Sequence, residues 1–443
     1  MEFTKLEITE NIKYVLNENG FSNSTEVQQK VIPLFLKKKD LIVKAMTGSG
    51  KTLSFLIPIA NFLDINTSKV IKCIIIAPTR ELANQIAEVV KMFKSVSSYI
   101  LIGGEPIEND LKIIDSSEIN TLIVTPGRFN EIINLRPEKF KSVEYLILDE
   151  ADKLLSIGFK VSVLNIISKL PKNRTTCLFS ATIDKSILNF TKLNLKNPIS
   201  VSINSDIIPD KLKIYYIKTS PKHKLSLLKN FLEKKSIIFF TTCAQVDFFY
   251  DLFTKMNISG ILRIHRKVKQ IERNKIYENF HKTGRWLFCT DVASRGIDFK
   301  NIYTVIHYDI PVDPLNFFHR SGRTGRNGNT GEVFLFLMEN EIKYINYLKI
   351  KNIDTEEYEC KDTSKHTSNI EIDNEITELA TKAVISYLRS YKEHALSYLL
   401  NIKDLNQEEI AQAYFLKKIP ENIFYTKNKN RFGIYKTAKK IKK

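Results

Sequence analysis

Short apolar runs alternate with longer amphipathic stretches from the beginning of the chain to about residue 340. This alternation is typical of strand, helix, strand units arranged around a parallel sheet. Strands are expected at 41–44, 71–77, 99–102, 121–124, 145–148 and 176–179, and again at 237–240, 258–264, 286–289, 305–307 and 333–336. Polar residues follow the strands of the first half, and ligands bind at the carboxyl ends of parallel strands. The pattern therefore predicts an α/β protein with ligand sites at its strand ends.

The alternation breaks between residues 197 and 213, where two prolines stand among polar residues. We interpret this break as a linker between two lobes. The expected organisation is a first lobe over 1–200, a linker over 201–212 and a second lobe over 213–345. A polar linker over 346–372, a helical extension over 373–424 and a basic tail over 425–443 are expected to follow.

Charge and cysteine content restrict the class of protein further. Lys and Arg outnumber Asp and Glu by 67 to 49, and the resulting net charge of +18 favours a polyanionic partner. The five cysteines are scattered without a Cys-x-x-Cys pair, which indicates mostly buried thiols in a reducing compartment. We find no metal-ligand spacing, no secretory signal and no apolar run near the ~20 residues of a membrane helix. The sequence thus predicts an intracellular soluble protein without a structural metal.

A glycine-rich loop follows the first expected strand and precedes an apolar helix, which is the context of a phosphate-binding loop. Its glycines would let backbone N–H groups wrap phosphates, and Lys51 would place a positive charge on the β and γ oxygens. The Thr52 hydroxyl could hold Mg²⁺. The alternative is a chance turn. The loop consists of Ala45, Met46, Thr47, Gly48, Ser49, Gly50, Lys51 and Thr52.

Three acidic residues follow the expected strand at 145–148. Asp149 is placed to bind Mg²⁺, partly through water, and Glu150 is placed to orient or deprotonate an attacking water. A solvated helix N-cap is the alternative interpretation of Asp149, Glu150 and Asp152. The phosphate-binding loop in the same half argues against that alternative, because the two motifs together serve nucleoside triphosphate hydrolysis.

The second half supplies positive charge for the transferring phosphoryl group in residues 319–326. Arg323 and Arg326 are candidate arginine fingers that reach across from the second lobe. A basic surface turn is the alternative. If the fingers are correctly assigned, the nucleotide lies between the lobes and closes the cleft. Binding and hydrolysis of the nucleotide are then coupled to movement of the lobes.

With these motifs in order, residues 3 to 340 resemble the DEAD-box RNA helicases. The resemblance implies two tandem RecA-like parallel-sheet lobes, RNA-dependent ATPase activity, ATP and Mg²⁺ as cofactors, and RNA as partner. It implies adenine contacts from Gln28 and an aromatic at Phe3 or Phe21, and a ribose contact from Asp298. Coupling of the acidic loop to lobe closure is implied for Asp152, Ser180, Thr182 and His319.

The same resemblance implies RNA contacts at strand ends and turns, where phosphate and sugar oxygens are bound without base readout. In the first lobe they are Thr79, Arg80, Gly103, Gly104, Thr125, Pro126 and Arg128, and in the second lobe Gln270, Arg273 and Thr290. The chain departs from the family pattern at Ser24 and Glu26, where prolines are usual, and at Arg266, where glycine is usual.

Beyond the second lobe, apolar residues recur at helical spacing between 379 and 391, which predicts a helix packed on that lobe. Lys382, Arg389 and Lys392 lie off this stripe. Residues 383 to 420 resemble a C-terminal domain of the DEAD-box branch that assembles large ribosomal subunits in the nucleolus. This implies precursor ribosomal RNA and ribosome assembly factors as partners, and a nuclear, nucleolar location with the cytoplasm as alternative. The basic tail suits the RNA backbone.

Three functions use these motifs. The first is an ATP-dependent RNA helicase that locally unwinds precursor ribosomal RNA during large (60S) subunit biogenesis. The second is an ATP-gated RNA clamp that nucleates ribonucleoprotein assembly with little unwinding. The third, a DNA translocase, is disfavoured by the set of RNA motifs in the first lobe.

Overall fold

The fold is described from a computed structural model. It describes residues 2–46, 48–65, 70–116, 118–156, 158–203, 212–231, 233–294, 299, 301–325, 330–360 and 372–420. Predicted site residues Thr47, Asp298 and Arg326 lie outside the described residues, as do the tail over 425–443, residues 204–211 of the first predicted linker and residues 361–371 of the second.

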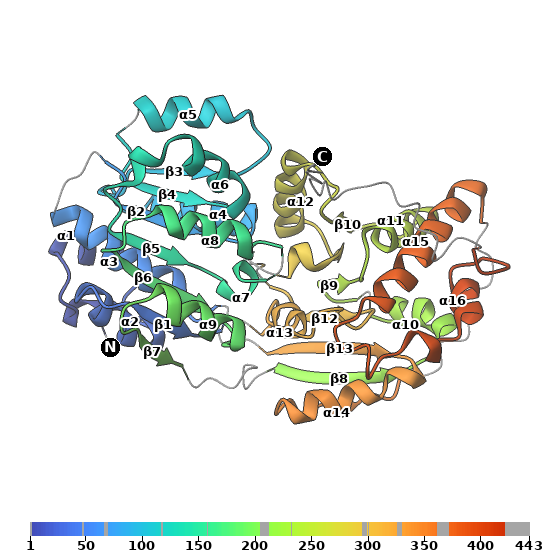
Figure 1. The fold of residues 1–443 in the computed structure, drawn as a ribbon. Helices are drawn as coiled ribbons and strands as arrows, with labels where there is room; N and C mark the ends of the chain where they lie inside the picture. Colours follow the sequence, from blue (N-terminus) through green and yellow to red (C-terminus); the bar gives the residue numbers. More distant parts are fainter. Residues whose placement is uncertain are drawn as a thin grey trace, which may run out of the picture.

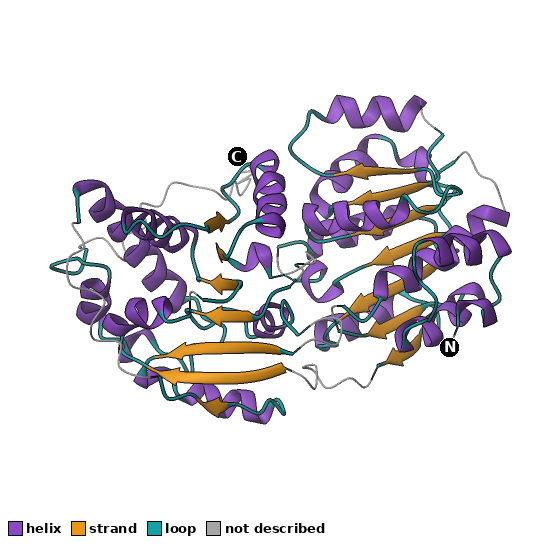
Figure 2. Ribbon diagram, turned by 180° about the vertical axis from the view of Figure 1, so that it is seen from behind, coloured by secondary structure: helices purple, strands orange, loops and turns teal. Residues whose placement is uncertain are grey.

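Two seven-stranded sheets, one in each half of the chain, organise the molecule (Figure 1). All their strand pairs are parallel, which confirms the predicted fold class. The first sheet has the order β3-β4-β2-β5-β6-β1-β7, and the second has the order β10-β11-β9-β12-β13-β8-β14. Because a parallel connection needs a crossover, helices pack on the sheets between successive strands (Figure 2).

The first lobe contains β1 (Leu41–Lys44), β2 (Cys73–Ile76), β3 (Ser98–Leu101), β4 (Thr121–Val124), β5 (Tyr145–Leu148), β6 (Thr175–Ser180) and β7 (Ile199–Ser202). Its helices are η1 (Phe3–Lys5), α1 (Glu10–Glu18), α2 (Glu26–Leu36), α3 (Lys51–Ile65), α4 (Arg80–Val90), α5 (Ile107–Ser116), α6 (Pro126–Leu135), η2 (Pro137–Phe140), α7 (Ala151–Leu154), α8 (Lys160–Lys169) and α9 (Lys185–Asn194).

The second lobe contains β8 (Leu212–Lys218), β9 (Ser236–Phe239), β10 (Ile261–Ile264), β11 (Trp286–Cys289), β12 (Thr304–His307), β13 (Gly331–Leu337) and β14 (Glu356–Glu357). Its helices are η3 (Pro221–His223), α10 (Lys224–Lys229), α11 (Cys243–Lys255), α12 (Gln270–Lys282), η4 (Asp291–Ala293), α13 (Leu315–Ser321), η5 (Glu339–Glu341) and α14 (Lys343–Ile350). The C-terminal extension adds α15 (Asn374–Lys392), η6 (Ile402–Asp404) and α16 (Gln407–Ala413).

The first sheet is buried on both faces, which explains its nearly continuous apolar strands. Ile75 of β2 belongs to one apolar cluster, together with residues of α2, α3 and α4. Its neighbours Ile74 and Ile76 belong to a second cluster, with residues of α6, α8 and α9. Since successive strand side chains point to opposite faces, the three isoleucines anchor helices on both sides of the sheet.

Every predicted strand is present, with differences at the ends. The largest difference is at β10, which begins at Ile261 rather than 258, because Asn257 and Gly260 have φ of 57° and 87° and form a turn. β7 falls inside the segment expected to be a linker, where it pairs with β1 at the sheet edge. Its two serines hide the strand in the sequence. β8 and β14 were also not predicted.

The extension is packed into the second lobe rather than attached loosely. Helix α15 lies against α11, and its buried stripe joins the apolar core of the lobe. The predicted helical stripe is confirmed at Ala380, Ala383, Val384, Tyr387, Leu388 and Tyr391, all of which are buried, whereas Leu379 is partly buried. Burying such a face is what stabilises a helix of this kind on a lobe.

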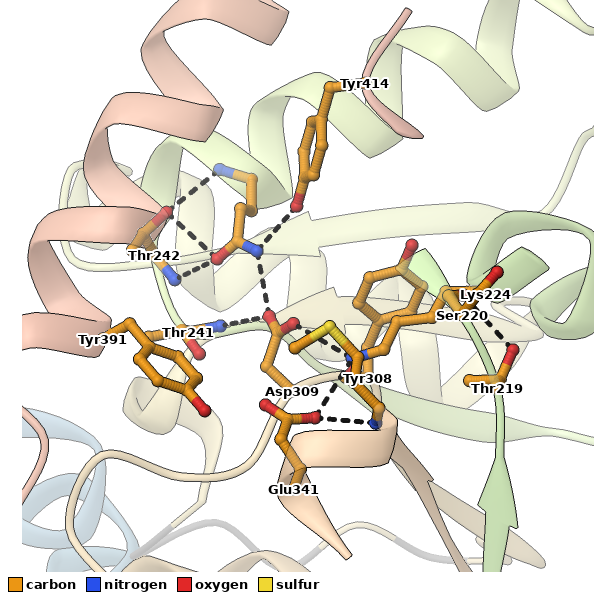
Figure 3. A network of polar contacts seen from close by, with 12 residues as sticks. Thr219, Ser220, Lys224, Thr241, Thr242, Tyr308, Asp309, Glu341, Tyr391 and Tyr414 are labelled. Carbon is orange, nitrogen blue, oxygen red and sulfur yellow. Dashed lines mark hydrogen bonds and ion pairs between the residues drawn. The ribbon is translucent and has the colours of Figure 1, made fainter. Parts of the chain in front are cut away.

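A buried network of hydrogen bonds joins the extension to the second lobe (Figure 3). Gln245 closes a capping box with Thr242 at the start of α11. The Gln245 Nε2 donates to Asp309 Oδ2 at 2.9 Å and to the Tyr414 hydroxyl at 2.8 Å. The hydroxyls of Thr242 and Ser386 are 2.8 Å apart. Because Gln245 is fully buried, the extension completes hydrogen bonds that the lobe needs.

Candidate ATP site and RNA cleft

The order of the first sheet brings the predicted ATP motifs together. Strands β5, β6 and β1 are consecutive neighbours, and Lys44 pairs with Ser180 in the parallel register. The Ala45 amide donates to the Ser180 carbonyl at 3.0 Å. The phosphate-binding loop after β1, the acidic loop after β5 and the Ser180 to Thr182 turn after β6 therefore meet at one edge of the sheet.

The phosphate-binding loop depends on glycine at its turns. Gly48 and Gly50 have φ of 84° and 93°, a left-handed conformation that other residues rarely adopt. A Cβ on Gly50 would lie 2.6 Å from Gln28 Nε2. Lys51 opens α3, is 8% exposed and donates to the Ala45 carbonyl at 2.9 Å. The loop thus holds a buried cation beside exposed backbone, as phosphate binding requires.

Gln28 ties the predicted adenine segment to this loop. Its Oε1 accepts from the Thr25 amide at 2.8 Å, and its Nε2 donates to the Gly50 carbonyl at 3.1 Å. Phe3 is buried in the apolar core, whereas Phe21 is 37% exposed. Of the two aromatic residues, Phe21 has the more accessible ring. Contact of any of these residues with adenine stays a prediction.

The acidic loop buries the carboxylates of both Asp149 and Glu150. Asp149 is 3% exposed, and burial raises the pKa of its carboxyl to about 6, although Lys51 opposes this. Glu150 is the N-cap of α7 in a left-handed conformation with φ of 49°, a backbone strain that is often found at functional sites. Its amide donates to Asp149 Oδ1 at 2.9 Å.

Two buried oxygen atoms near these motifs have no hydrogen-bond partner among the described residues, Glu150 Oε2 and Thr182 Oγ1. A buried oxygen without a partner is costly unless water or a ligand satisfies it. A carboxylate oxygen beside the buried Lys51 and Asp149 fits a hydrated Mg²⁺ and a phosphate group. The donor set is therefore suited to the ATP and Mg²⁺ that the sequence predicted.

The second lobe approaches this site through α13 and the turn that follows it. His319 Nε2 lies 3.0 Å from Asp152 Oδ2 of α7, and both side chains are almost completely buried. Arg323 is 2% exposed, and its Nε donates to the His319 carbonyl at 3.1 Å. The lobes are thus in direct contact where the coupling residues were predicted.

A cleft of about 1570 Å³ lies beside this contact and is lined by both lobes. Eight of the ten predicted RNA contacts line it: Thr79, Arg80, Gly103, Thr125, Arg128, Gln270, Arg273 and Thr290. Gly104 and Pro126 are not among its lining residues. Eight positions that the sequence suggested one by one therefore share a single cavity.

Within the cleft, two arginines of the first lobe are fixed by their neighbours. The Arg80 guanidinium lies across Gly103 and Gly104, and a Cβ on Gly104 would stand 2.9 Å from Arg80 Nη1. Arg128 is 8% exposed and pairs with Asp110 at 2.7 Å. Small residues and a buried carboxylate thus hold both guanidinium groups in place. Contact of either arginine with RNA stays a prediction.

Arg273 has a role that sequence reasoning did not anticipate. Its Nη1 donates to Glu81 Oε1 of the first lobe at 2.8 Å, and its Nη2 donates to the Arg266 carbonyl at 2.8 Å. The predicted RNA contact at Arg273 is untested, but this side chain joins the two lobes at the edge of the cleft.

Sequence reasoning also missed that α15 lines the cleft. Lys382, Ser386 and Arg389 are among the lining residues and come from the face opposite the buried stripe. Their spacing of four and three residues places them on one helix face. That spacing was visible in the sequence, but the direction of the face depends on how the helix docks.

In the part of the chain that the structure describes, no helix is long and apolar enough to span a membrane. The described residues also contain no group of three or more His, Cys, Asp or Glu side chains that could hold a metal ion.

Two parallel-sheet lobes define a two-lobed nucleotide-driven helicase, because the first carries a phosphate-binding loop and an acidic loop, and His319 of the second contacts Asp152 beside the acidic loop. The sequence matches "DEAD/DEAH box helicase" over residues 25–190, "Helicase conserved C-terminal domain" over 223–328, and "ATP-dependent rRNA helicase SPB4-like, C-terminal extension" over 373–422. The chain belongs to the DEAD-box family of ATP-dependent RNA helicases and carries the SPB4-like C-terminal extension.

Similar proteins extend over nearly the whole chain. ATP-dependent rRNA helicase SPB4 of Encephalitozoon cuniculi is 42% identical over 416 residues, covering 92% of this chain and 89% of that protein. Human ATP-dependent RNA helicase DDX55 is 36% identical, covering 92% and 73%. The solved structure of Mss116p bound to ssRNA and AMP-PNP has a TM-score of 0.79 at 28% identity, covering 92% of this chain and 88% of that chain.

Proposed function

We propose that this protein remodels precursor ribosomal RNA by local, ATP-driven unwinding during assembly of the large ribosomal subunit. The observation that carries the proposal is the cleft, which gathers eight predicted RNA contacts and one face of the SPB4-like extension. The Arg, Lys, Thr and Gly residues among those that line the cleft suit the RNA backbone rather than base edges. The net charge of +18 favours the same partner.

In this proposal the first lobe binds ATP and the second lobe completes the site. Lys51 holds the β and γ phosphates, and Glu150 takes the proton of the attacking water. Thr52 and Asp149 would hold Mg²⁺, which would supply positive charge to the phosphate oxygens. Gln28 selects adenine, and Asp298 binds the ribose. Arg323 and Arg326 stabilise the charge of the transferring phosphoryl group.

Lobe closure couples the two sites. The Asp152 and His319 contact lies between the ATP site and the cleft, so it forms only when the lobes are in this arrangement. RNA that spans both lobes therefore favours the arrangement in which the arginines reach the nucleotide. Because two ligands that stabilise one state increase each other's affinity, ATP and RNA are expected to bind cooperatively.

A duplex substrate can be opened by this cycle without long translocation. The cleft would hold one strand in a conformation set by the two lobes and α15, while the second strand separates. Hydrolysis of ATP would then release the bound RNA strand from the cleft. The nucleolus as location and ribosome assembly factors as partners belong to this proposal, and they are supported by the SPB4-like extension.

Strand displacement tests the proposal. We expect ATP-dependent release of the short strand from an RNA duplex that carries a single-stranded overhang. ATP-dependent binding without strand release would contradict unwinding and indicate the clamp. ATPase stimulation by DNA equal to that by RNA would indicate a DNA translocase. Crosslinking in cells, followed by mapping of the bound RNA, identifies the substrate and contradicts the proposal if precursor ribosomal RNA is not enriched.

A further inference from the structure

Cys243 differs from the chain's other described cysteines in its position. It is the first residue of α11, is partly exposed and lines the RNA cleft. Cys73, Cys177 and Cys289 are buried in strands of the two sheets, and burial raises the pKa of each thiol. The sequence predicted mostly buried thiols, and Cys243 is an exception.

The start of α11 stabilises negative charge on Cys243. The first-turn N–H groups of a helix carry partial positive charge, and a thiolate at this place benefits from it. Thr242 is the N-cap, and its side chain accepts from the Gln245 amide. The other N–H groups of the first turn remain directed toward the helix start, where the Cys243 side chain begins.

A second side chain acts on the same sulfur. His265, directly after β10, acts electrostatically on the Cys243 thiol and lowers its pKa. Its Nδ1 accepts from the Lys267 amide at 3.3 Å, and its Nε2 lies 2.9 Å from Asp247 Oδ1, one turn along α11 from the cysteine. His265 is 4% exposed, so the imidazole is held in place. Cys243, His265 and Asp247 thus form a cluster of a thiol, an imidazole and a carboxylate, and such neighbours activate thiols.

Charge in this cluster favours the ion pair of thiolate and imidazolium. Burial lowers the pKa of His265, but Asp247 and Cys243 outweigh it and raise the pKa to about 9. Burial raises the pKa of Cys243, but His265, with Arg266 and Lys267, lowers it overall. Arg266 stands where the family usually has glycine, so this chain adds a cation beside the thiol.

We propose that Cys243 is a modification site for soft electrophiles and low-molecular-weight disulfides, and that its modification blocks the RNA cleft. In the disulfide reaction the Cys243 thiolate attacks one sulfur of the reagent. A new S–S bond forms, the reagent's S–S bond breaks, and the second sulfur leaves as a thiolate. The reagent is reduced and Cys243 is oxidised. The blocking step rests on the proposed RNA function, whereas the reactivity of the thiol does not.

The expected effect follows from the place of the sulfur. Thr242, Arg266 and Gln270 line the same cleft, so an adduct on Cys243 occupies the space proposed for the RNA backbone. With glutathione disulfide the adduct also brings carboxylates, which repel phosphate. RNA-stimulated ATPase of the treated protein should therefore fall, and reduction with dithiothreitol should restore it.

Cys360 provides an internal comparison, because it is also partly exposed and is absent from the cleft lining. The folded protein is treated with iodoacetamide at about pH 7, and labelling of each cysteine is followed by mass spectrometry. We expect Cys243 to react severalfold faster than Cys360, since the pKa of the Cys243 thiol is lowered and a lower thiol pKa raises the fraction present as thiolate. Equal rates at the two cysteines would overturn the proposal.

Asp247→Asn tests the positioning residue. It keeps the size of the side chain but removes the charge that holds His265 as an imidazolium, so labelling of Cys243 should slow severalfold while Cys360 is unaffected. In Cys243→Ser, the ratio of RNA-stimulated ATPase with and without glutathione disulfide should stay at one. Loss of activity in that variant on treatment would place the sensitive cysteine elsewhere and overturn the proposal.

Protection of Cys243 by bound RNA tests the blocking of the cleft separately from the reactivity of the thiol. Single-stranded RNA with a non-hydrolysable ATP analogue should slow labelling of Cys243 and leave Cys360 unchanged. Fast labelling that RNA does not slow would overturn the blocking step and count against the proposed RNA cleft, while the thiol's reactivity would stand. Slow labelling of Cys243 without RNA would contradict the proposed reactivity of the thiol and leave the proposed function intact.

Discussion

Arg273 of the second lobe and Glu81 of the first form an ion pair with an Nη1 to Oε1 distance of 2.8 Å. Their side chains are 12% and 6% exposed, so the pair is largely shielded from water and salt. It lies at the edge of the cleft that both residues line. The pair therefore requires the arrangement in which the two lobes are in contact.

Glu81→Gln should weaken closure, because the neutral amide keeps a hydrogen bond but loses the charge opposite Arg273. Arg273 keeps its bonds to the Val268 and Arg266 carbonyls, but its charge is less well compensated without the Glu81 carboxylate. We expect the RNA concentration for half-maximal ATPase to rise severalfold. Glu88→Gln on the same helix is the control, since its pair with Lys91 is exposed. Equal RNA dependence of the two variants would contradict the role of the pair.

Glu150→Gln should retain ATP and RNA binding but lose turnover. The substitution removes the base and keeps Asp149, which is proposed to hold Mg²⁺. We expect kcat to fall by about 10²–10⁴-fold, with nucleotide affinity changed little. Single-turnover ATP hydrolysis and equilibrium binding measure the two effects, with Glu138→Gln at the surface as control. Normal turnover in Glu150→Gln would exclude the catalytic assignment.

Tyr414→Phe should loosen the extension. It removes the hydroxyl that accepts from Gln245 Nε2 inside a fully buried network. Losing one such hydrogen bond costs about 1 kcal/mol, and more if Gln245 is left unsatisfied. Urea unfolding should show this loss. Tyr398→Phe, at a side chain that is 79% exposed, is the control and should change nothing measurable. Identical stability of the two variants would refute the proposed attachment.

His394, which follows α15, should make this attachment sensitive to acid. Burial lowers the pKa of His394 from 6.5 to about 4, and its Nδ1 accepts from the Leu396 amide. The folded protein favours the neutral ring. The contribution of neutral His394 to the free energy of unfolding is therefore fully present above pH 6.5 and is lost as pH falls toward about 4. At most about 3 kcal/mol is involved.

His394→Asn keeps an acceptor near the position of Nδ1 but cannot be protonated. The free energy of unfolding of this variant should therefore depend less on pH between about 6.5 and 4 than that of the original protein. Parallel pH profiles of the two proteins would show that His394 does not titrate as the buried ring requires.

The strands could be predicted from the sequence because the strands of a parallel sheet that is buried on both faces consist of consecutive apolar residues. The ATP motifs were predictable for a related reason: each follows a strand, and β5, β6 and β1 end at the same edge. β7 was hidden because Ser200 and Ser202 face away from the core at the sheet edge.

Contacts between distant segments were not predictable from the sequence. Nothing local in α12 indicates that Arg273 meets Glu81, since the contact depends on the angle between the lobes. The buried stripe of α15 was evident, but not that Lys382 and Arg389 face the cleft. The cluster of Cys243 with His265 likewise joins residues of different elements, which only the packed lobe brings together.

The central claim is that both lobes and α15 form one RNA cleft that closes with ATP. Ultraviolet crosslinking of single-stranded RNA to the purified protein, followed by identification of the modified peptides, tests it most directly. With a non-hydrolysable ATP analogue, crosslinks should appear in the segments around Arg80, Gln270 and Arg389, and they should weaken together without nucleotide. Crosslinks confined to one lobe, or unchanged when the nucleotide is omitted, would contradict it.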